Sequence, residues 1–333
     1  MLSLYHAWIT AWESKLAARD VDRRAQPFEW GTEWLSLPPG GDDAAALRSA
    51  LENALERPDA FYSYRKPRVF RLDGSHLSFE SPIRTPYEDN NTTHADYYPG
   101  RRPNRRAVVV LPQWNASPTS HVALCNLLNR FGISALRLNM AFHGPRRPPG
   151  HVRAEFHVSG NLGRTVQATR QSVVDACCCL DWLESRGYDR LGVVGTSLGS
   201  CVAFLAAAHD PRVRAGAFNH VAGWFGDVVW TGLATRHVRA SLEAHITQEQ
   251  LRRYWAIISP ACHTTRFRDR DFRSLMIWGG YDPVFLPEHS REVIASFQPT
   301  RALRLPCGHY TLGKFPFNWI AGLSISRFLA HSL

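Results

Sequence analysis

The stretch Leu191-Gly-Val-Val-Gly-Thr-Ser-Leu-Gly199 decides the fold, because an apolar run leads directly to a serine that lies between two glycines. The apolar residues predict a strand buried on both faces, and the small residues that continue to Ala208 predict a helix. Bulky side chains would clash on such a tight strand-to-helix turn, and Gly195 and Gly199 relieve that crowding. The turn also puts the serine oxygen at the N-terminus of a helix, where the dipole favours developing negative charge. This pattern predicts that Ser197 is a nucleophile.

The sequence on both sides of this stretch alternates between strand-like and helical patterns from residue 107 onward. Such alternation is typical of a mostly parallel sheet with helices on both faces, so we predict an α/β fold. Residues 67–333 would form this domain, with a small helical lid inserted at 222–260, where Thr247 and Gln250 have the spacing of a capping box. We expect strands at 107–111, 133–138, 191–194, 213–218, 275–278 and 302–305, and helices at about 124–131, 165–186, 198–208 and 318–329.

The chain before this domain has a different pattern. Residues 1–66 are predicted to form a helical extension, residues 69–79 a β-hairpin turning at Asp73-Gly74, and residues 81–105 a long loop. The first helix carries an aromatic-rich stripe that we expect to pack on the domain, while contact with a membrane surface or a second subunit is the alternative. The stripe consists of Leu4, Trp8, Ile9, Trp12 and Leu16.

A serine hydroxyl is a weak nucleophile and needs a base, which the late part of the chain offers. His309 follows the last predicted strand in a glycine-containing loop, and Asp282 follows the strand at 275–278. The order serine, aspartate, histidine is one in which triads of this kind occur, and the aspartate would orient the imidazole without taking its proton. The alternatives are that His309 is an ordinary loop histidine, one of 15 in the chain, and that Asp282 is a turn residue before Pro283.

Two backbone N–H groups are needed to bind the oxyanion of an acyl-transfer reaction. Leu198, directly after the predicted nucleophile, is the first candidate. The second should come from the loop after the strand at 107–111, where we favour Trp114 and take Gln113 as the alternative. Loops that supply this second donor are commonly glycine-rich, but residues 112–115 contain no glycine.

Residues 107–331 resemble the α/β-hydrolase superfamily, in the branch that includes dienelactone-hydrolase-like and acyl-ester-cleaving members. The Pro-Gln-Trp-Asn segment at 112–115 and the Phe-His-Gly-Pro-Arg-Arg-Pro loop at 142–148 are similar to the group related to α/β-hydrolase domain-containing protein 18. The resemblance implies that Ser197 is the nucleophile, Asp282 the acid and His309 the base.

The loop at 141–164 should face the active site, because it follows a strand at the same edge of the sheet. It contains His143 and Arg146, which we predict to contact substrate, although a solvated loop with local salt bridges explains its many arginines equally well. Histidine spacing typical of a metal site is missing, so no metal is expected. Aromatic residues of the lid should make the pocket apolar, namely Trp224, Phe225 and Trp230.

The net charge of +10 does not by itself predict a nucleic-acid partner. Only three of the 39 basic residues are lysine, and such a bias across the whole chain indicates base composition of the coding sequence rather than a binding surface. The seven cysteines match no disulfide framework and are expected in the core. The first 20 residues lack the pattern of a signal peptide and no apolar run is long enough to span a membrane, so a cytoplasmic protein is expected.

Together these patterns predict a serine hydrolase that cleaves a small-molecule carboxylic ester or related acyl compound without a cofactor. An acyltransferase or a peptidase with the same three residues is one alternative. A non-catalytic ligand-binding protein on the same fold is an alternative of another class. The sequence does not specify the acyl group, the alcohol or the oligomeric state.

Overall fold

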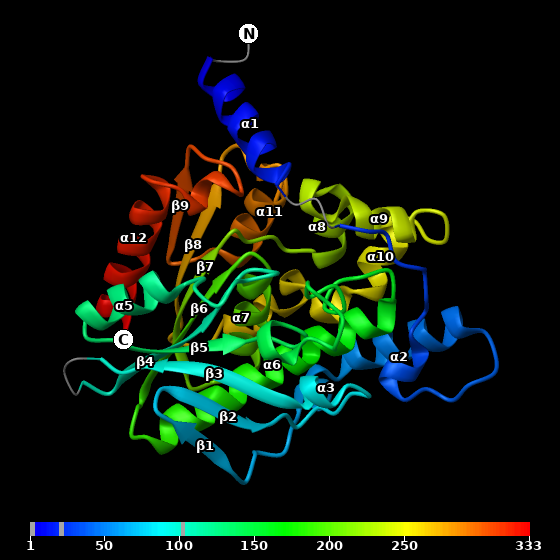
Figure 1. Ribbon diagram of the computed structural model, residues 1–333, viewed down its shortest axis with the longest axis horizontal. Helices are drawn as coiled ribbons and strands as arrows, with labels where there is room; N and C mark the ends of the chain where they lie inside the picture. The colour runs from blue at the N-terminus through cyan, green and yellow to red at the C-terminus, as the bar shows by residue number, and fades with distance from the viewer. Residues whose placement is uncertain (1–3, 20–22, 101–103) are drawn as a thin grey trace.

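The computed structural model describes residues 4–19, 23–100 and 104–333, which build a nine-stranded sheet with helices on both faces (Figure 1). The strands are β1 Phe70–Asp73, β2 His76–Glu80, β3 Thr92–Tyr98, β4 Arg106–Leu111, β5 Ser134–Asn139, β6 Arg190–Thr196, β7 Val213–Asn219, β8 Arg273–Gly279 and β9 Arg301–Leu305. Their order in the sheet is β1-β2-β3-β5-β4-β6-β7-β8-β9. The six strands from β5 to β9 in this order run parallel, whereas β1, β2 and β3 pair antiparallel. This is the predicted α/β-hydrolase fold.

The helices confirm the predicted alternation and include two that were not predicted, at 88–91 and at 287–297. They are α1 Leu4–Ala17, α2 Asp43–Glu56, α3 Pro58–Tyr62, α4 Glu88–Asn91, α5 Val122–Arg130, α6 Leu162–Ser185, α7 Leu198–His209, α8 Phe225–Thr231, α9 Arg236–Leu242, α10 Gln248–Tyr254, α11 Pro287–Phe297 and α12 Phe317–Ser332. Short 3-10 helices are η1 Thr32–Leu35, η2 Gly144–Arg146, η3 Leu233–Thr235, η4 Ala256–Ile258, η5 Pro260–Phe267 and η6 Thr311–Gly313.

The central strands are buried on both faces because each face is covered by its own helices. In β4, Val108 and Val110 pack with residues of α5 and α12, whereas Val109 and Leu111 pack with residues of α6 and α7. Side chains alternate across a strand, so the continuous apolar run of β4 supplies both cores at once. Figure 1 shows α5 and α12 together on one side of the sheet.

The predicted loop at 81–105 is wrong in part, because it contains α4 and β3. Thr92-Thr-His-Ala-Asp-Tyr-Tyr98 alternates in burial, with Thr93 and Ala95 fully buried. Such alternation is typical of an antiparallel strand, and β3 pairs on both sides, with β2 and β5. The prolines and asparagines around the strand obscured this pattern. The hairpin before it is confirmed, but its turn residues are Gly74 and Ser75 rather than Asp73 and Gly74, because Asp73 pairs with His76 and only Gly74 of the predicted two has a positive φ, of 57°.

The N-terminal extension shares the hydrophobic cores of the domain. Leu47 and Leu51 of α2 join the core on the α6 side, and the Tyr62 hydroxyl donates to the carbonyl oxygen of Ile257 at 2.9 Å. Residues of α1 join the core on the α5 and α12 side of the sheet, but only part of the predicted aromatic-rich stripe is buried. Ile9 and Leu16 are buried, whereas Leu4 is 91% and Trp8 53% exposed.

The region between β7 and β8, which contains the predicted lid at 222–260, is mostly helical. It contains α8, α9 and α10, which lie together beside the carboxyl ends of the strands in Figure 1. The predicted capping box is confirmed at the start of α10. The Gln250 amide donates to Thr247 Oγ1 at 3.2 Å, and the Thr247 amide donates to Gln250 Oε1 at 2.8 Å.

Among the residues that the structure describes, no helix combines the length and the apolar character that a membrane crossing requires. All seven cysteines are free, and six of them are buried, including the three consecutive ones in α6. The prediction that most cysteines are core residues is therefore confirmed.

Candidate active site

Ser197 lies on the sharp turn between β6 and α7. Its backbone has φ 57° and ψ −122°, a conformation that a non-glycine residue rarely adopts. A Cβ at Gly195 would lie 2.1 Å from the carbonyl oxygen of Gly199, and a Cβ at Gly199 would lie 2.1 Å from that of Leu111. Both positions therefore require glycine, for the reason that the sequence suggested. The Ser197 amide donates to the carbonyl oxygen of Asn219 at 2.8 Å, which fixes the turn to β7.

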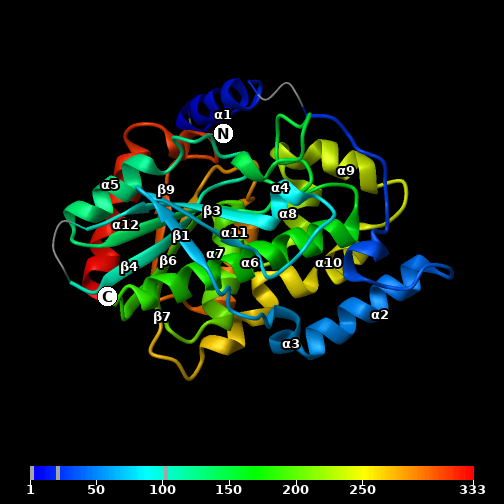
Figure 2. The same cartoon turned by 60° about the horizontal axis from the view of Figure 1, so that its bottom comes forward.

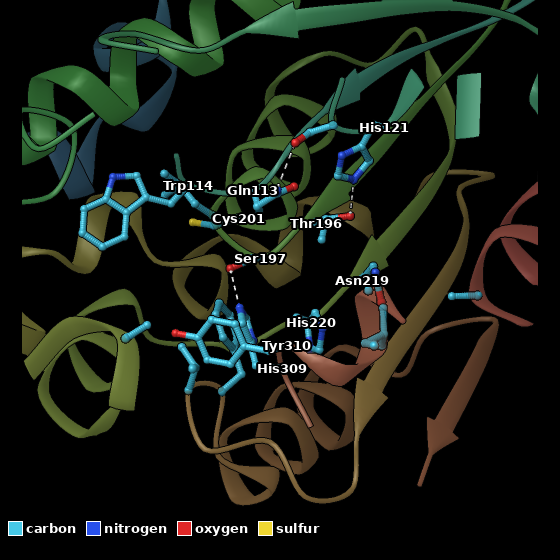
Figure 3. A pocket seen from close by; sticks show the side chains of 18 of the residues that line it. Gln113, Trp114, His121, Thr196, Ser197, Cys201, Asn219, His220, His309 and Tyr310 are labelled. Carbon is cyan, nitrogen blue, oxygen red and sulfur yellow. Dashed lines mark hydrogen bonds between the residues drawn. The ribbon is translucent and has the colours of Figure 1, made fainter. Parts of the chain in front are cut away.

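The structure brings His309 and Asp282 to this serine. Ser197 Oγ lies 3.2 Å from His309 Nε2 (Figure 3), and His309 Nδ1 lies 3.0 Å from Asp282 Oδ2. An Nδ1–H that donates to the carboxylate leaves Nε2 free to accept the serine proton. His309 comes from the loop after β9 and Asp282 from the loop after β8, so three distant points of the chain meet at one edge of the sheet.

The Asp282 carboxylate is held on both oxygens. Oδ1 accepts hydrogen bonds from the amides of Val284 at 2.7 Å and Phe285 at 2.8 Å. Burial alone would raise the pKa of this carboxyl, but the imidazoles of His309 and His220 hold it well below its usual range. Asp282 is therefore ionised throughout the range in which histidine titrates.

His220 is a member of this cluster that the sequence did not predict. Its Nδ1 lies 2.8 Å from Asp282 Oδ2, the same oxygen that faces His309, and the two imidazole rings are 4.3 Å apart. Burial, and after it the nearby His309 ring, lowers the pKa of His220. The only sequence signal for His220 was its position directly after β7, because the residue that follows each parallel strand lies at this edge of the sheet.

The same three side chains form a group that could hold a metal ion. The ligand atoms of His220, Asp282 and His309 lie within 4.8 Å of one another. Two histidines and one carboxylate are donors that zinc accepts. The His309 Nδ1 contact with Asp282 Oδ2 is a hydrogen bond, whereas His220 Nδ1, at 2.8 Å from the same oxygen, forms no hydrogen bond with the described residues.

A cavity of about 1010 Å³ opens over Ser197. Of the predicted pocket residues, Trp224 and Phe225 from the lid line it, as do Gln113 and Trp114 (Figure 3 labels the last two). Much of the remaining lining is aliphatic or aromatic, with contributions from Leu198, Val228, Val229, Val284, Phe285, Leu312 and Ile325. The cavity is therefore suited to a ligand with an apolar part.

The predicted oxyanion donors lie beside Ser197. Leu198 is the first residue of α7, and the close approach of Gly199 to Leu111 places this helix start against the loop that carries Gln113 and Trp114. Within the part of the chain that the structure describes, none of these three backbone amides donates a hydrogen bond to another protein group. The Trp114 side chain is anchored by its Nε1, which donates to the carbonyl oxygen of Ala154 at 2.9 Å.

Comparison with known protein families identifies the chain. The family described as "Alpha/beta hydrolase domain containing 18" matches residues 73–266, more than half of the sequence. The chain belongs to this family. The matched residues include Ser197 and the oxyanion candidates, whereas Asp282 and His309 lie beyond them.

Solved structures with the same fold include esterases. Acetyl xylan esterase 1 from Thermoanaerobacterium sp. has 15% identity and a TM-score of 0.61, with 96% of this chain and 98% of that chain covered. An acetyl xylan esterase from a Paenibacillus species has 16% identity and a TM-score of 0.61, with 96% and 99% covered. At these identities the similarity concerns the fold alone. No curated protein matches the sequence.

In this α/β-hydrolase-domain-containing-18 family member, three predicted substrate contacts lie away from the cavity, and we correct those predictions. His143 is buried, its Nδ1 lies 2.8 Å from the carbonyl oxygen of Ala141, and burial lowers its pKa to about 3. Trp230 packs beside the guanidinium of Arg239 on the lid. The third residue, Arg146, is fully buried in an ion pair.

Arg146 holds the loop after β5 to α6 rather than a substrate anion. Its Nη1 lies 2.8 Å from Asp175 Oδ2, and its guanidinium also donates to the carbonyl oxygens of Asn90 and Asn139. A fork of donors with this geometry is the reason that arginine, and not lysine, fits such a site. The sequence showed an arginine in a loop, but it could not show the buried carboxylate on the opposite helix.

Replacing Arg146 by methionine is expected to lower the free energy of unfolding by about 3–5 kcal/mol, because it leaves Asp175 buried and unpaired. KM for an ester substrate should stay unchanged, since the guanidinium does not reach the cavity. Chemical denaturation and steady-state kinetics measure the two quantities, with Arg147→Met on the neighbouring half-exposed arginine as the control. A raised KM with unchanged stability would restore the role of Arg146 in substrate binding.

Proposed function

We propose that the protein is a serine hydrolase that cleaves a carboxylic ester or a related acyl bond. Ser197 is the nucleophile, His309 the general base and Asp282 the orienting acid. The observation that supports this most directly is the chain of short contacts from Ser197 Oγ to His309 Nε2, at 3.2 Å, and from His309 Nδ1 to Asp282 Oδ2, at 3.0 Å. Family membership and the fold shared with esterases are consistent with it.

In the first half of the reaction, His309 takes the proton of Ser197 as the serine oxygen attacks the acyl carbon. The carbonyl oxygen becomes an oxyanion, for which the amides of Leu198 and of Trp114 or Gln113 are the donors. Preorganised donors of this kind typically contribute about 10²–10³-fold each to kcat. The protonated His309 then gives its proton to the leaving alcohol, and the acyl group remains on the serine as an ester.

In the second half, a water molecule takes the place of the alcohol. His309 accepts a proton from this water as its oxygen attacks the acyl-enzyme, and the carboxylic acid leaves as Ser197 recovers its proton. Asp282 remains ionised in both halves and stabilises the imidazolium each time it forms. The apolar lining from Phe225, Val228 and Leu312 favours an ester with a hydrophobic part.

A fluorophosphonate probe tests the proposal, because it labels a serine only where a base activates the hydroxyl. We expect stoichiometric labelling of the wild-type chain, with the modified peptide containing Ser197, and no labelling of Ser197→Ala. Ser200→Ala is a suitable control, because Ser200 is a neighbouring buried serine whose hydroxyl is occupied by the carbonyl oxygens of Ser197 and His220. Equal labelling of the wild type and Ser197→Ala would exclude this nucleophile.

A further inference from the structure

Helix α1 contacts the loop that carries His309 through a buried carboxylate, Glu13. This side chain is 2% exposed, although it belongs to a helix at the surface. Its Oε2 accepts a hydrogen bond from the Tyr310 amide at 3.0 Å, and its Oε1 accepts one from the Thr311 amide at 2.6 Å. Figures 1 and 2 both show α1 lying over the segments that follow β8 and β9. The two residues after His309 are therefore held by one side chain of the N-terminal extension.

The residue before His309 is fitted to the same carboxylate. A Cβ at Gly308 would lie 2.4 Å from Glu13 Cδ, so only glycine lets the carboxylate approach. The Gly308 amide donates to Thr311 Oγ1 at 2.8 Å and closes the turn around the histidine. Loop amides that have no partner in a regular element need an acceptor when they are buried, and a carboxylate is a strong one.

Other residues of α1 contact the loop that carries Asp282. The His6 ring lies 4.9 Å from the ring of Tyr281, the residue before Asp282. The Tyr281 amide donates to the carbonyl oxygen of Cys307 at 3.0 Å, which joins the aspartate loop to the histidine loop. The Tyr5 hydroxyl donates to the carbonyl oxygen of Pro306. Helix α1 thus contacts both loops whose relative position sets the distance from His309 to Asp282.

We infer that Glu13 is a positioning residue, which holds the His309 loop so that the imidazole meets Ser197 and Asp282 together. The inference rests on the proposed function and adds to it a role for the N-terminal helix, which lies outside the matched family region. A displacement of about 1 Å in a catalytic group can lower the rate about 10²-fold. Without the carboxylate, the buried Thr311 amide and the partly buried Tyr310 amide lose their acceptor, and the loop is free to shift by such an amount.

The wild type, Glu13→Ala and Glu13→Gln test the inference in hydrolysis of p-nitrophenyl butyrate. The assays are run below the lowest unfolding temperature of these chains and their control. In Glu13→Ala, kcat should fall about 10–100-fold with KM within about 3-fold of wild type, because the loop positions the base and not the substrate. Glu13→Gln should lie between wild type and Glu13→Ala, since its amide oxygen can accept from one of the two N–H groups. This order follows from the number of hydrogen bonds that each side chain can accept.

Ile9→Ala is the matched control for stability. Ile9 lies one turn before Glu13 in α1 and is fully buried in the core, but its apolar side chain cannot accept a hydrogen bond from the loop. We expect it to lower the unfolding temperature while leaving kcat within about 3-fold of wild type. The inference is overturned if Glu13→Ala keeps kcat near wild type, or if Ile9→Ala loses as much activity as Glu13→Ala. Wild-type chain that neither hydrolyses the ester nor reacts with a fluorophosphonate would instead overturn the proposed function, and the inference with it.

Discussion

Ser197→Ala and His309→Ala are each expected to lower kcat about 10⁶-fold, and the double variant is expected to be no slower than either. The reason is that the two side chains act as one unit. A serine without its base is not activated, and a base without its serine has no proton to accept in this reaction. Stopped assays with high enzyme concentration would measure kcat for the three variants on one ester. Losses that multiply in the double variant would show that the two residues act independently.

The variant His220→Ala distinguishes the roles of His220 and His309, the two histidines that face Asp282. Both imidazoles have a nitrogen close to Asp282 Oδ2, at 3.0 Å for His309 and 2.8 Å for His220, but among the described residues His220 Nδ1 forms no hydrogen bond. Only His309 has a nitrogen that hydrogen bonds to Ser197 Oγ. We therefore expect His220→Ala to lower kcat about tenfold, because Asp282 loses one of the two imidazoles beside its Oδ2, a change that corresponds to about 1.4 kcal/mol in the barrier. A loss near that of His309→Ala would assign the base to His220 instead.

The sequence predicted those parts of the site whose signals are local. Strand, serine, glycines and helix occupy one continuous stretch around Ser197, and each glycine is required by contacts inside the turn or with the adjacent strand. His309 and Asp282 were found by their places after strands, because all parallel strands end at the same edge of the sheet. This argument uses topology and needs no knowledge of side-chain contacts.

Contacts between residues distant in sequence could not be predicted in the same way. His220 also follows a strand, but nothing in its neighbourhood distinguishes it from the other histidines of the chain. Glu13 appeared only as a polar residue of an aromatic-rich helix, and its partners are amides near the other end of the chain. Arg146 was read as a possible anion clamp because its partner, Asp175, lies on a helix whose orientation the sequence does not give.

These differences have a common physical origin. A backbone turn is determined by steric limits within a few residues, so it leaves a pattern that can be read directly. A buried charge is determined by the partner that compensates its desolvation, and this partner can come from any element that packs nearby. Sequence therefore indicated the turn at Ser197 more directly than the residues that contact the loops of His309 and Asp282.

Asp282→Asn is expected to lower kcat about 10⁴-fold while leaving the fold intact. The asparagine oxygen can still accept from the amides of Val284 and Phe285, which now bind Oδ1 of the aspartate. The amide nitrogen would then face His309 Nδ1, where the carboxylate oxygen lies in the wild type. Two donors cannot share this contact, so Nδ1 would lose its proton and Nε2 would carry it instead. An imidazole in that tautomer cannot accept the proton of Ser197.

This mechanism predicts which measurements change and which do not. The unfolding temperature and KM of Asp282→Asn should remain close to wild type, since the side chain keeps its shape and lies below the substrate cavity. Fluorophosphonate labelling of Ser197 should slow in proportion to kcat, because both reactions need the same proton transfer. Asp227→Asn serves as the control, because Asp227 is a buried aspartate of the lid that pairs with Arg252 and not with a histidine. If Asp282→Asn kept a tenth or more of the wild-type kcat, the imidazole would have to be oriented by another group, and Asp282 would be a turn residue that fixes its loop.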